Sequence, residues 1–184
     1  VLAENALIKR WKGKMLEAFK TRETKVVKLL LERCNSEESG LNIKDELGKT
    51  PFMWACSNGR KDVVQLLLDH SERIDLNARA NNGGTALMWA CYNGHKDVVQ
   101  LLLDHSDPNI ELNAKDEDGT TALNYAFKQY VIRSKQYCQY KDIVELLLVK
   151  LVMAKLNQME APQKPVHQMM TRQKTKMIKA KLNQ

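Results

Sequence analysis

The fold is decided by a stretch that occurs twice, 35 residues apart: Thr50 to Ser71, TPFMWACSNGRKDVVQLLLDHS, and Thr85 to Ser106, TALMWACYNGHKDVVQLLLDHS. The segments MWAC and KDVVQLLLDHS are identical in the two copies. A period of 20–50 residues is typical of an array of stacked structural units, in which each unit contacts only its neighbours. The sequence therefore predicts an array rather than a single globular core.

Two weaker copies flank this pair. The downstream copy opens at Asp116–Leu123 and closes at Lys141–Leu148, and the upstream copy keeps only the close, at Lys25–Leu31. We therefore predict four units, at about residues 13–43, 44–79, 80–115 and 116–151, of which the first and last are atypical.

Each unit carries the signals of two helices. Thr50 is a good N-cap and Pro51 is tolerated at the first helical position, so a short helix begins there. Gly59 ends that helix, because glycine adopts the left-handed conformation common at helix C-termini. A second helix follows, in which Val63, Val64 and Leu66–Leu68 cover more than one face, so it has to pack between its partner and the next unit. Residues 76–83 predict an extended piece and a turn.

The pattern GxTPFMxAC, followed by NGxxDVVxLLL and closed by LNA, resembles the ankyrin repeat. The resemblance implies an all-α fold, an ankyrin-repeat solenoid of stacked helix–turn–helix units with short β-hairpin fingers, over about residues 13–157. The histidine usual in the family's first helix is replaced by Met53, Met88 and Asn124, so its hydrogen bonds must be replaced locally. The resemblance also implies a concave face that binds a partner protein.

The last unit and the two ends depart from the repeat. Nine extra residues near 128–140 contain neither Gly nor Pro and have helical spacing, so we expect the first helix of that unit to continue for about two turns. Residues 1–12 are expected to form an N-terminal capping helix. Residues 158–184 are expected to form a basic C-terminal tail, in which 164–184 carry methionines among lysines and no acid.

Composition limits the class of protein. The chain has 184 residues, 43% hydrophobic and 28% charged, which is typical of a folded soluble protein. No apolar run reaches the roughly 20 residues that span a bilayer, and residues 1–6 lack the pattern of a signal peptide. Because the four cysteines are far apart in the sequence and the chain is large enough to fold without disulfides, we expect reduced thiols. Reduced thiols indicate an intracellular protein, and we expect it in the cytoplasm, with the nucleus as an alternative. These cysteines are Cys34, Cys56, Cys91 and Cys138.

No group of residues in the sequence forms a recognisable catalytic or metal-binding motif. His70 and His105 recur with the repeat near a helix end, and His95 aligns with Arg60, so none is indicated as a metal ligand. Residues 116–119, DEDG, lack the spacing of a calcium loop and fall on a predicted turn. We therefore predict no enzyme activity, no catalytic residue, no cofactor and no metal site.

The candidate partner-binding residues either vary between matching units on exposed elements or are large aromatics. Trp54, Trp89 and Tyr125 share one repeat position; a binding stripe is one interpretation, and packing between first helices is the favoured alternative. Ordinary solvated surface is the alternative for the others. The full set is Glu46, Leu47, Lys49, Trp54, Ser57, Asn58, Arg79, Asn81, Asn82, Trp89, Tyr92, Asn93, Lys115, Glu117, Asp118, Tyr125, Tyr130, Arg133 and Tyr137.

The sequence thus favours a monomeric, non-enzymatic scaffold that binds an unidentified protein. The alternative hypothesis starts from charge. The net charge is +7, and residues 161–184 hold six bases and no acid, whereas residues 34–160 hold fourteen bases and eighteen acids. The tail, 164–184, could therefore bind an acidic partner such as nucleic acid, a cytoskeletal filament or a calmodulin-like protein, with the repeats as carrier.

Overall fold

The computed structural model describes residues 24–33, 40–105, 110–133 and 138–160. The chain divides into two compact units, Val1–Val149 and Lys150–Gln184, and the second contributes only the end of one long helix to the described residues. The predicted N-terminal capping helix and most of the predicted basic tail lie outside the described residues, as does Cys34.

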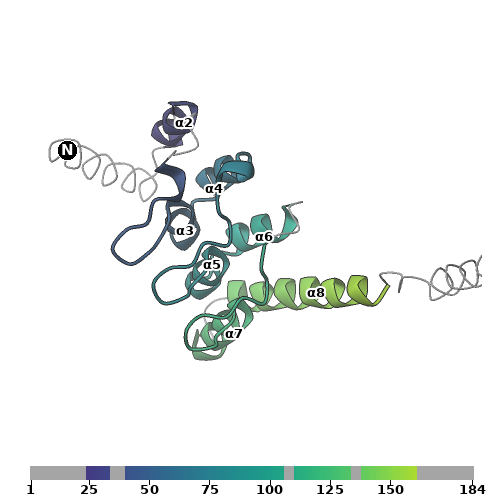
Figure 1. Ribbon diagram of the computed structural model, residues 1–184. Helices are drawn as coiled ribbons and strands as arrows, with labels where there is room; N and C mark the ends of the chain where they lie inside the picture. Colours follow the sequence, from purple (N-terminus) through teal and green to yellow (C-terminus); the bar gives the residue numbers. More distant parts are fainter. Residues whose placement is uncertain (1–23, 34–39, 106–109, 134–137, 161–184) are drawn as a thin grey trace, which may run out of the picture. The chain divides into compact units, whose positions relative to one another are not determined.

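Figure 1 shows the described helices following one another in chain order. Two short 3₁₀ turns, η1 at Gly40–Asn42 and η2 at Ser71–Arg73, lie between them. The α-helices are α2 (Thr24–Arg33), α3 (Pro51–Ser57), α4 (Lys61–Leu68), α5 (Ala86–Asn93), α6 (Lys96–Asp104), α7 (Ala122–Arg133) and α8 (Cys138–Glu160).

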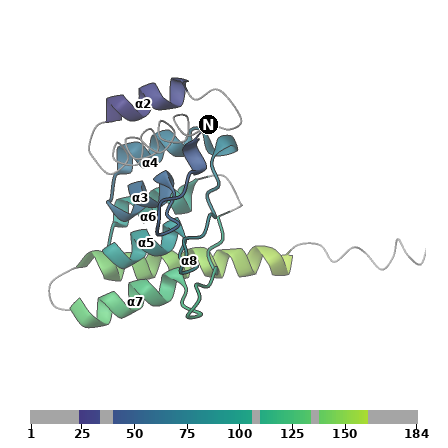
Figure 2. The same ribbon diagram turned by 60° about the vertical axis from the view of Figure 1, so that its left-hand side comes forward.

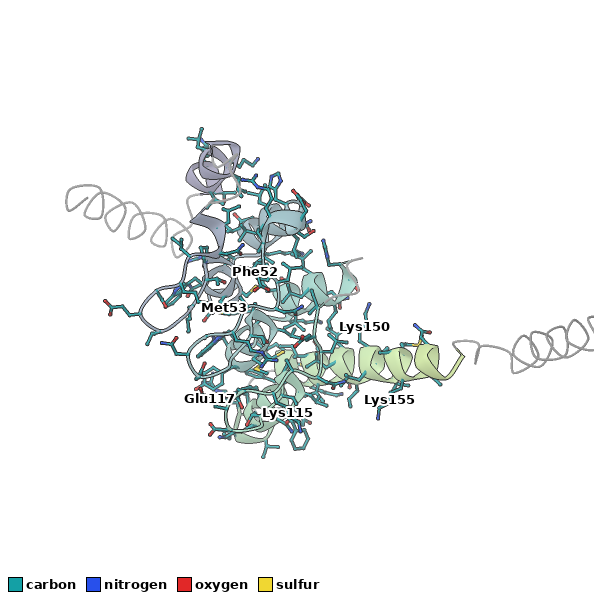
Figure 3. All side chains as sticks on the ribbon, in the orientation of Figure 1. Phe52, Met53, Lys115, Glu117, Lys150 and Lys155 are labelled. Carbon is teal, nitrogen blue, oxygen red and sulfur yellow. The ribbon has the colours of Figure 1, made fainter. Side chains whose placement is uncertain are left out.

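Within the compact part Val1–Val149, the helices stack in two layers. In one layer α3 packs against α5 and α5 against α7; in the other α2 packs against α4 and α4 against α6 (Figures 1 and 2). A continuous apolar core runs between the layers, and Phe52 and Met53 of α3 point into it (Figure 3). The expected two-sided burial of the second helix is confirmed, since Val63, Val64, Leu67 and Leu68 are all buried. Stacking therefore supplies the core that one helix pair could not form.

The predicted helix starts are confirmed. The Thr50 hydroxyl accepts a hydrogen bond from the Met53 amide at 3.3 Å, and the Thr85 and Thr121 hydroxyls repeat this contact with residues 88 and 124. In two units another side chain makes the local hydrogen bond that the family's usual histidine would make, as the sequence predicted. Met88 Sδ accepts from the Thr85 amide at 3.5 Å, and Asn124 Oδ1 accepts from the Thr121 amide at 3.0 Å.

Each first helix ends on a glycine that the next unit covers. Gly59 and Gly94 have φ angles of +66° and +75°, the left-handed conformation that the sequence predicted. His95 packs on Gly59 and its Nε2 lies 2.9 Å from the Ser57 carbonyl oxygen. At the equivalent place Tyr140 packs on Gly94 and donates to the Tyr92 carbonyl at 3.4 Å. The side chain at this repeat position, His95 before α6 and Tyr140 in the first turn of α8, therefore contacts the preceding unit.

The fingers are tight turns. No residue of the described ranges is in a β-strand, so the predicted hairpin strands are not confirmed. The turn 45–49 is closed by the Asp45 amide bonded to the Lys49 carbonyl at 3.0 Å, and turns 80–84 and 116–120 close in the same way. A five-residue turn leaves too few residues for a ladder, but neighbouring fingers still bond to each other, as the Asn81 amide does to the Leu47 carbonyl at 3.0 Å.

Within the described residues the insertion contributes to two helices, whereas the sequence predicted a two-turn extension of the first helix alone. Helix α7 has 12 residues against 8 in α5, an extension of about one turn. Beyond residues 134–137, which lie outside the described residues, α8 begins at Cys138, although its repeat counterpart α6 begins at Lys96, the equivalent of Lys141. Tyr140 packs under Gly94 from the first turn of α8, whereas its counterpart His95 reaches Gly59 from the residue before α6.

Candidate functional site

An aromatic row runs across the first-helix layer. Trp54, Trp89 and Tyr125 occupy equivalent positions of α3, α5 and α7, and Tyr92 lies one helical turn after Trp89. The Trp89 and Tyr92 ring centroids are 6.4 Å apart and those of Tyr92 and Tyr125 are 5.7 Å apart, both edge-to-face. Each ring of the row remains at least partly exposed. The rings from Trp89 to Tyr125 therefore pack along the layer, and the row still presents apolar surface to solvent, while its use as a binding stripe stays a prediction.

Lys49 joins the row instead of facing solvent. Its Nζ lies 3.4 Å from the centroid of the Trp89 ring and 4.7 Å from that of Trp54, and the residue is only 7% exposed. Burial lowers the pKa of Lys49, partly opposed by the Asp45 carboxylate. The expectation that Lys49 is an exposed finger residue is wrong, because the two indole faces attract its ammonium away from solvent.

Finger carboxylates hold two of the rings. Asp45 Oδ1 accepts from the Leu47 and Lys49 amides at 2.9 and 2.8 Å, and its Oδ2 accepts from Trp54 Nε1 at 2.8 Å. One carboxylate thus fixes the turn of its own finger and the orientation of the ring behind it.

Asp116 repeats this arrangement with Tyr125, whose hydroxyl donates to Asp116 Oδ2 at 2.6 Å. Burial works to raise the pKa of Asp116, but hydrogen bonds from the Tyr125 hydroxyl and from the Thr120 and Asp118 amides outweigh it and lower that pKa. The same contact, with burial, raises the pKa of Tyr125 to about 12. Both groups therefore keep their ordinary charge over a wide pH range.

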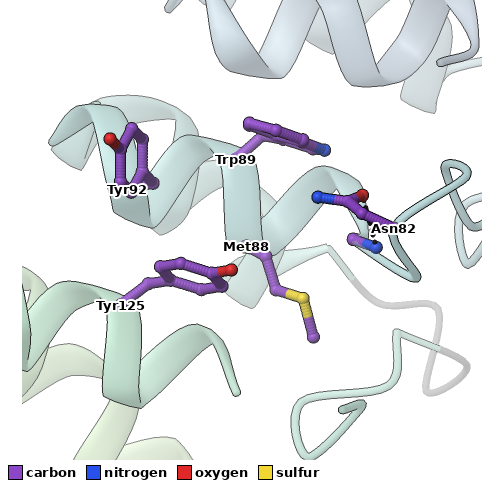
Figure 4. A pocket seen from close by; sticks show the side chains of 6 residues that line it. Asn82, Met88, Trp89, Tyr92 and Tyr125 are labelled. Atoms are coloured by element: carbon purple, nitrogen blue, oxygen red, sulfur yellow. Dashed lines mark hydrogen bonds between the residues drawn. The ribbon is translucent and has the colours of Figure 1, made fainter. Parts of the chain in front are cut away.

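A pocket of about 240 Å³ lies beside the middle of the row (Figure 4). Its walls are Asn82 and Gly84 of one finger, Met88, Trp89 and Tyr92 of α5, and Tyr125 of α7. Its volume is below the roughly 300–1,000 Å³ of most small-molecule sites, and its walls are mainly apolar. It can hold one side chain of a partner more readily than a cofactor.

Several finger candidates are used within the chain. The Arg79 guanidinium donates to the Lys115 carbonyl at 2.6 Å and pairs with Glu111 at 3.1 Å. Asn81 Nδ2 donates to the Glu46 carbonyl at 2.9 Å. Because these side chains tie neighbouring fingers together, their substitution would alter the array as well as its surface.

The remaining candidates divide between the fingers and the helix ends. Lys115 and Glu117 lie on the last finger (Figure 3). Asn93 Nδ2 donates to the Ser57 carbonyl and hydroxyl at 3.0 and 3.1 Å, which joins two helix ends. Tyr137 lies outside the described residues, and Tyr130 and Arg133 lie on α7, away from the fingers in sequence. The exposed candidates on the fingers are Glu46, Leu47, Asn82, Lys115, Glu117 and Asp118, and half-buried Asn58 caps α3.

The described residues offer no reactive centre. They contain no group of three or more His, Cys, Asp or Glu side chains placed to hold a metal ion. Cys56, Cys91 and Cys138 are free thiols, and burial raises the pKa of Cys56 and Cys91, so these two are poor nucleophiles. The acids at 116–118 serve the turn, since Asp116 Oδ1 accepts from the Asp118 and Thr120 amides.

Sequence reasoning did not single out Asp45, Ala80, Asp116 or Met88 as parts of the site. A position-by-position alignment of the units contained the signal, because residues 45, 80 and 116 are equivalent and read Asp, Ala, Asp. What the alignment could not supply was the partner of each carboxylate, nine residues further along the chain.

Comparison with known proteins agrees with this geometry. A family model of ankyrin repeats (three copies) matches residues 15–116 and again residues 72–160. Osteoclast-stimulating factor 1 of Monopterus albus is 46% identical over 39 residues, which are 21% of this chain and 18% of that protein's length. In the described part of the chain, no helix combines the length and the apolar character that crossing a membrane requires. Since the family model covers well over half of the sequence, the chain belongs to the ankyrin-repeat family.

Proposed function

We propose that this protein is a non-enzymatic scaffold that binds a partner protein through its inner face. The inner face is defined as the aromatic row (Trp54, Trp89, Tyr92 and Tyr125) together with the finger turns 45–49, 80–84 and 116–120. Ankyrin repeats generally mediate protein–protein interaction, which supports the class of function. In this proposal the units form one solenoid, the inner face is its concave side, and the protein acts as a monomer.

The observation that carries the proposal is the partly exposed aromatic row. Tryptophan and tyrosine bury large areas with few rotatable bonds and dominate the binding energy of many interfaces. Tyr92 is 43% exposed, although it stands between two other rings of the row. A row of this kind beside a pocket is the surface on which a partner's side chains would gain most by leaving water.

The fingers support the proposal because they are held in place before binding. The Glu117 amide donates to the Asn82 carbonyl at 3.2 Å, and the Lys44 ammonium donates to the Arg79 carbonyl at 2.9 Å. Each finger is therefore bonded to the next. A surface that is already ordered loses little conformational entropy on association, which favours affinity.

The test is capture of a partner from native lysate by the full chain and by Tyr92→Ala, with thermal melts to show that the variant is folded. Gln65→Ala is the matched control, since Gln65 is an exposed residue of α4 outside the inner face. We expect Tyr92→Ala to weaken capture at least tenfold and Gln65→Ala to leave it unchanged. Equal capture by all three proteins would refute the proposal.

The alternative, binding through the basic tail, is separated by a second variant. Deletion of residues 161–184 removes six positive charges. Under our proposal this deletion leaves capture intact. If capture requires the tail and falls steeply between low and moderate salt, a charge-driven interaction with an acidic polymer replaces the inner face as the function.

A further inference from the structure

The third unit differs from both neighbours at two finger positions beside the pocket. Where the second and fourth units have Asp45 and Asp116, the third has Ala80. Where they have Lys49 and Thr120, it has Gly84. Gly84 lines the pocket beside Trp89. The neighbouring units place Asp45 and Asp116 against the equivalent rings, and Lys49 against Trp54.

The first difference leaves the Trp89 indole N–H without an acceptor. In the neighbouring units the ring's polar atom donates to a finger carboxylate, from Trp54 to Asp45 and from Tyr125 to Asp116. Ala80 has no carboxylate, and Trp89 Nε1 is buried with no hydrogen-bond partner in the described part of the chain. Buried donors are usually hydrogen-bonded in folded proteins, so the unpaired N–H group of Trp89 calls for an explanation.

In the third unit a different side chain accepts the hydrogen bond from the last amide of the finger turn. In the second unit the Asp45 carboxylate accepts from the Lys49 amide, whereas in the third unit Asn82 Oδ1 accepts from the equivalent Gly84 amide at 3.1 Å. Asn82 thus replaces one of the two turn bonds that Asp45 makes, whereas nothing replaces the bond to the indole. The nitrogen edge of Trp89 points toward Asn82 (Figure 4).

The second difference opens the space beside that nitrogen. A Cβ atom on Gly84 would lie 3.1 Å from Trp89 Nε1 and 3.0 Å from Asn82 Oδ1. The φ angle of Gly84 is outside the left-handed region, so the backbone does not require glycine here. What glycine provides is room. Asn82 is exposed on its finger, so its side chain can turn aside to admit a ligand atom, and its hydrogen bond to the Gly84 amide is then replaced by one from that amide to water or to the ligand.

The chemistry of the walls selects the ligand. The unpaired group is a donor, so the ligand must supply an acceptor. The Asp116 carboxylate is already bonded to the Tyr125 hydroxyl and to two amides, so it offers little to a cation. The Lys49 ammonium lies on the Trp89 ring and disfavours a second positive charge there. The rest of the wall is apolar.

We propose that this pocket binds one aliphatic side chain of a partner peptide, with a backbone carbonyl beside that side chain accepting the hydrogen bond from Trp89 Nε1. The inference rests on the proposed function and specifies its recognition chemistry. The volume of about 240 Å³ suits a leucine-sized group. Binding would satisfy the Trp89 indole, which the fingers leave unpaired, and would bury apolar surface on Met88, Tyr92 and Tyr125.

The probe is N-acetyl-L-leucine N′-methylamide, titrated into the full chain while the indole N–H resonances are followed by NMR. The sequence has three tryptophans, and Trp89→Phe identifies the signal of Trp89. We expect a saturable downfield shift of that signal with Kd on the order of millimolar. N-acetylglycine N′-methylamide has the same amides without the side chain, and should bind at least tenfold more weakly.

Ala80→Asp is the decisive variant, because it restores the carboxylate of the flanking units. We expect it to shift the Trp89 indole signal before any probe is added, to raise the melting temperature, and to weaken probe binding about tenfold or more. Asn113→Asp is the matched control, since it adds the same charge at an exposed position outside the pocket, and should bind as the parent does.

The inference would be overturned by the absence of a saturable shift of the Trp89 signal, or by equal binding by the parent and Ala80→Asp. The glycine and leucine probes binding equally would overturn it as well, because the apolar walls would then contribute nothing. Since the probes are small amides, failure here leaves the partner-capture test with Tyr92→Ala unaffected, and failure of that capture test would remove the inner face as a whole.

Discussion

Replacement of Asp45 by alanine tests how far one finger carboxylate organises the inner face. The change removes three hydrogen bonds: from the Leu47 amide, the Lys49 amide and Trp54 Nε1. Leu47 is exposed, so water replaces its bond at a cost of about 0.5 kcal/mol. The other two donors belong to buried or half-buried residues and cost about 1–1.5 kcal/mol each. We expect a loss of about 3 kcal/mol in the free energy of unfolding.

Urea and thermal unfolding of the full chain measure this loss. For a chain of this size, about 3 kcal/mol corresponds to a decrease of roughly 6–12 °C in Tm. Asp69→Ala is the control, because that exposed carboxylate accepts only from the side chain of Gln65, at 2.8 Å, among the bonds described for it. It should change stability by less than about 0.5 kcal/mol.

Asp45→Asn separates the acceptor from its charge. An asparagine keeps one oxygen for the turn amides but presents its amide group to Trp54, so we expect about half of the alanine effect. A loss under about 0.5 kcal/mol for Asp45→Ala would refute the view that the carboxylate holds the turn and the ring together. It would also weaken the comparison with Ala80 from which the chemistry of the pocket is inferred.

Further outcomes follow from burial and titration. Leu102→Ala, at a 2% exposed core position, should cost about 2–5 kcal/mol in a urea melt, whereas Phe127→Ser, 55% exposed on the last unit, should cost under about 1 kcal/mol. In a Cys34→Ser background, Cys138 should react with a thiol reagent before the two buried cysteines, which should react only on unfolding. By ultraviolet titration Tyr125 should ionise near pH 12, so the stability from its raised pKa is present below its ordinary pKa and is lost as pH rises through about 12. Asp116→Asn should bring the Tyr125 pKa back toward its ordinary value.

The repeat period and the helix signals determined the local structure. Thr50 and Thr85 cap helices where the sequence placed caps, and Gly59 and Gly94 end them in the left-handed conformation. These features were predictable because a cap or a terminal glycine acts on groups within four residues of itself. The burial of the second helices followed in the same way, since their apolar pattern allows no other environment.

Only the tertiary structure decided which groups meet across units. Lys49 lies between two tryptophans that belong to different repeats, and its position in sequence, on a polar turn, indicates an exposed residue. The sequence predicted that the insertion extends the first helix alone, whereas α8 also begins earlier than its counterpart, and Tyr140 of that added start packs against Gly94 of the preceding unit. Identical local sequences occur in the second and third units, yet one indole is paired and the other is not, since the acceptor is supplied by a finger that the helix does not contain. Local signals specify helices and turns, whereas hydrogen-bond partners and pockets depend on distances between segments that the sequence does not encode locally.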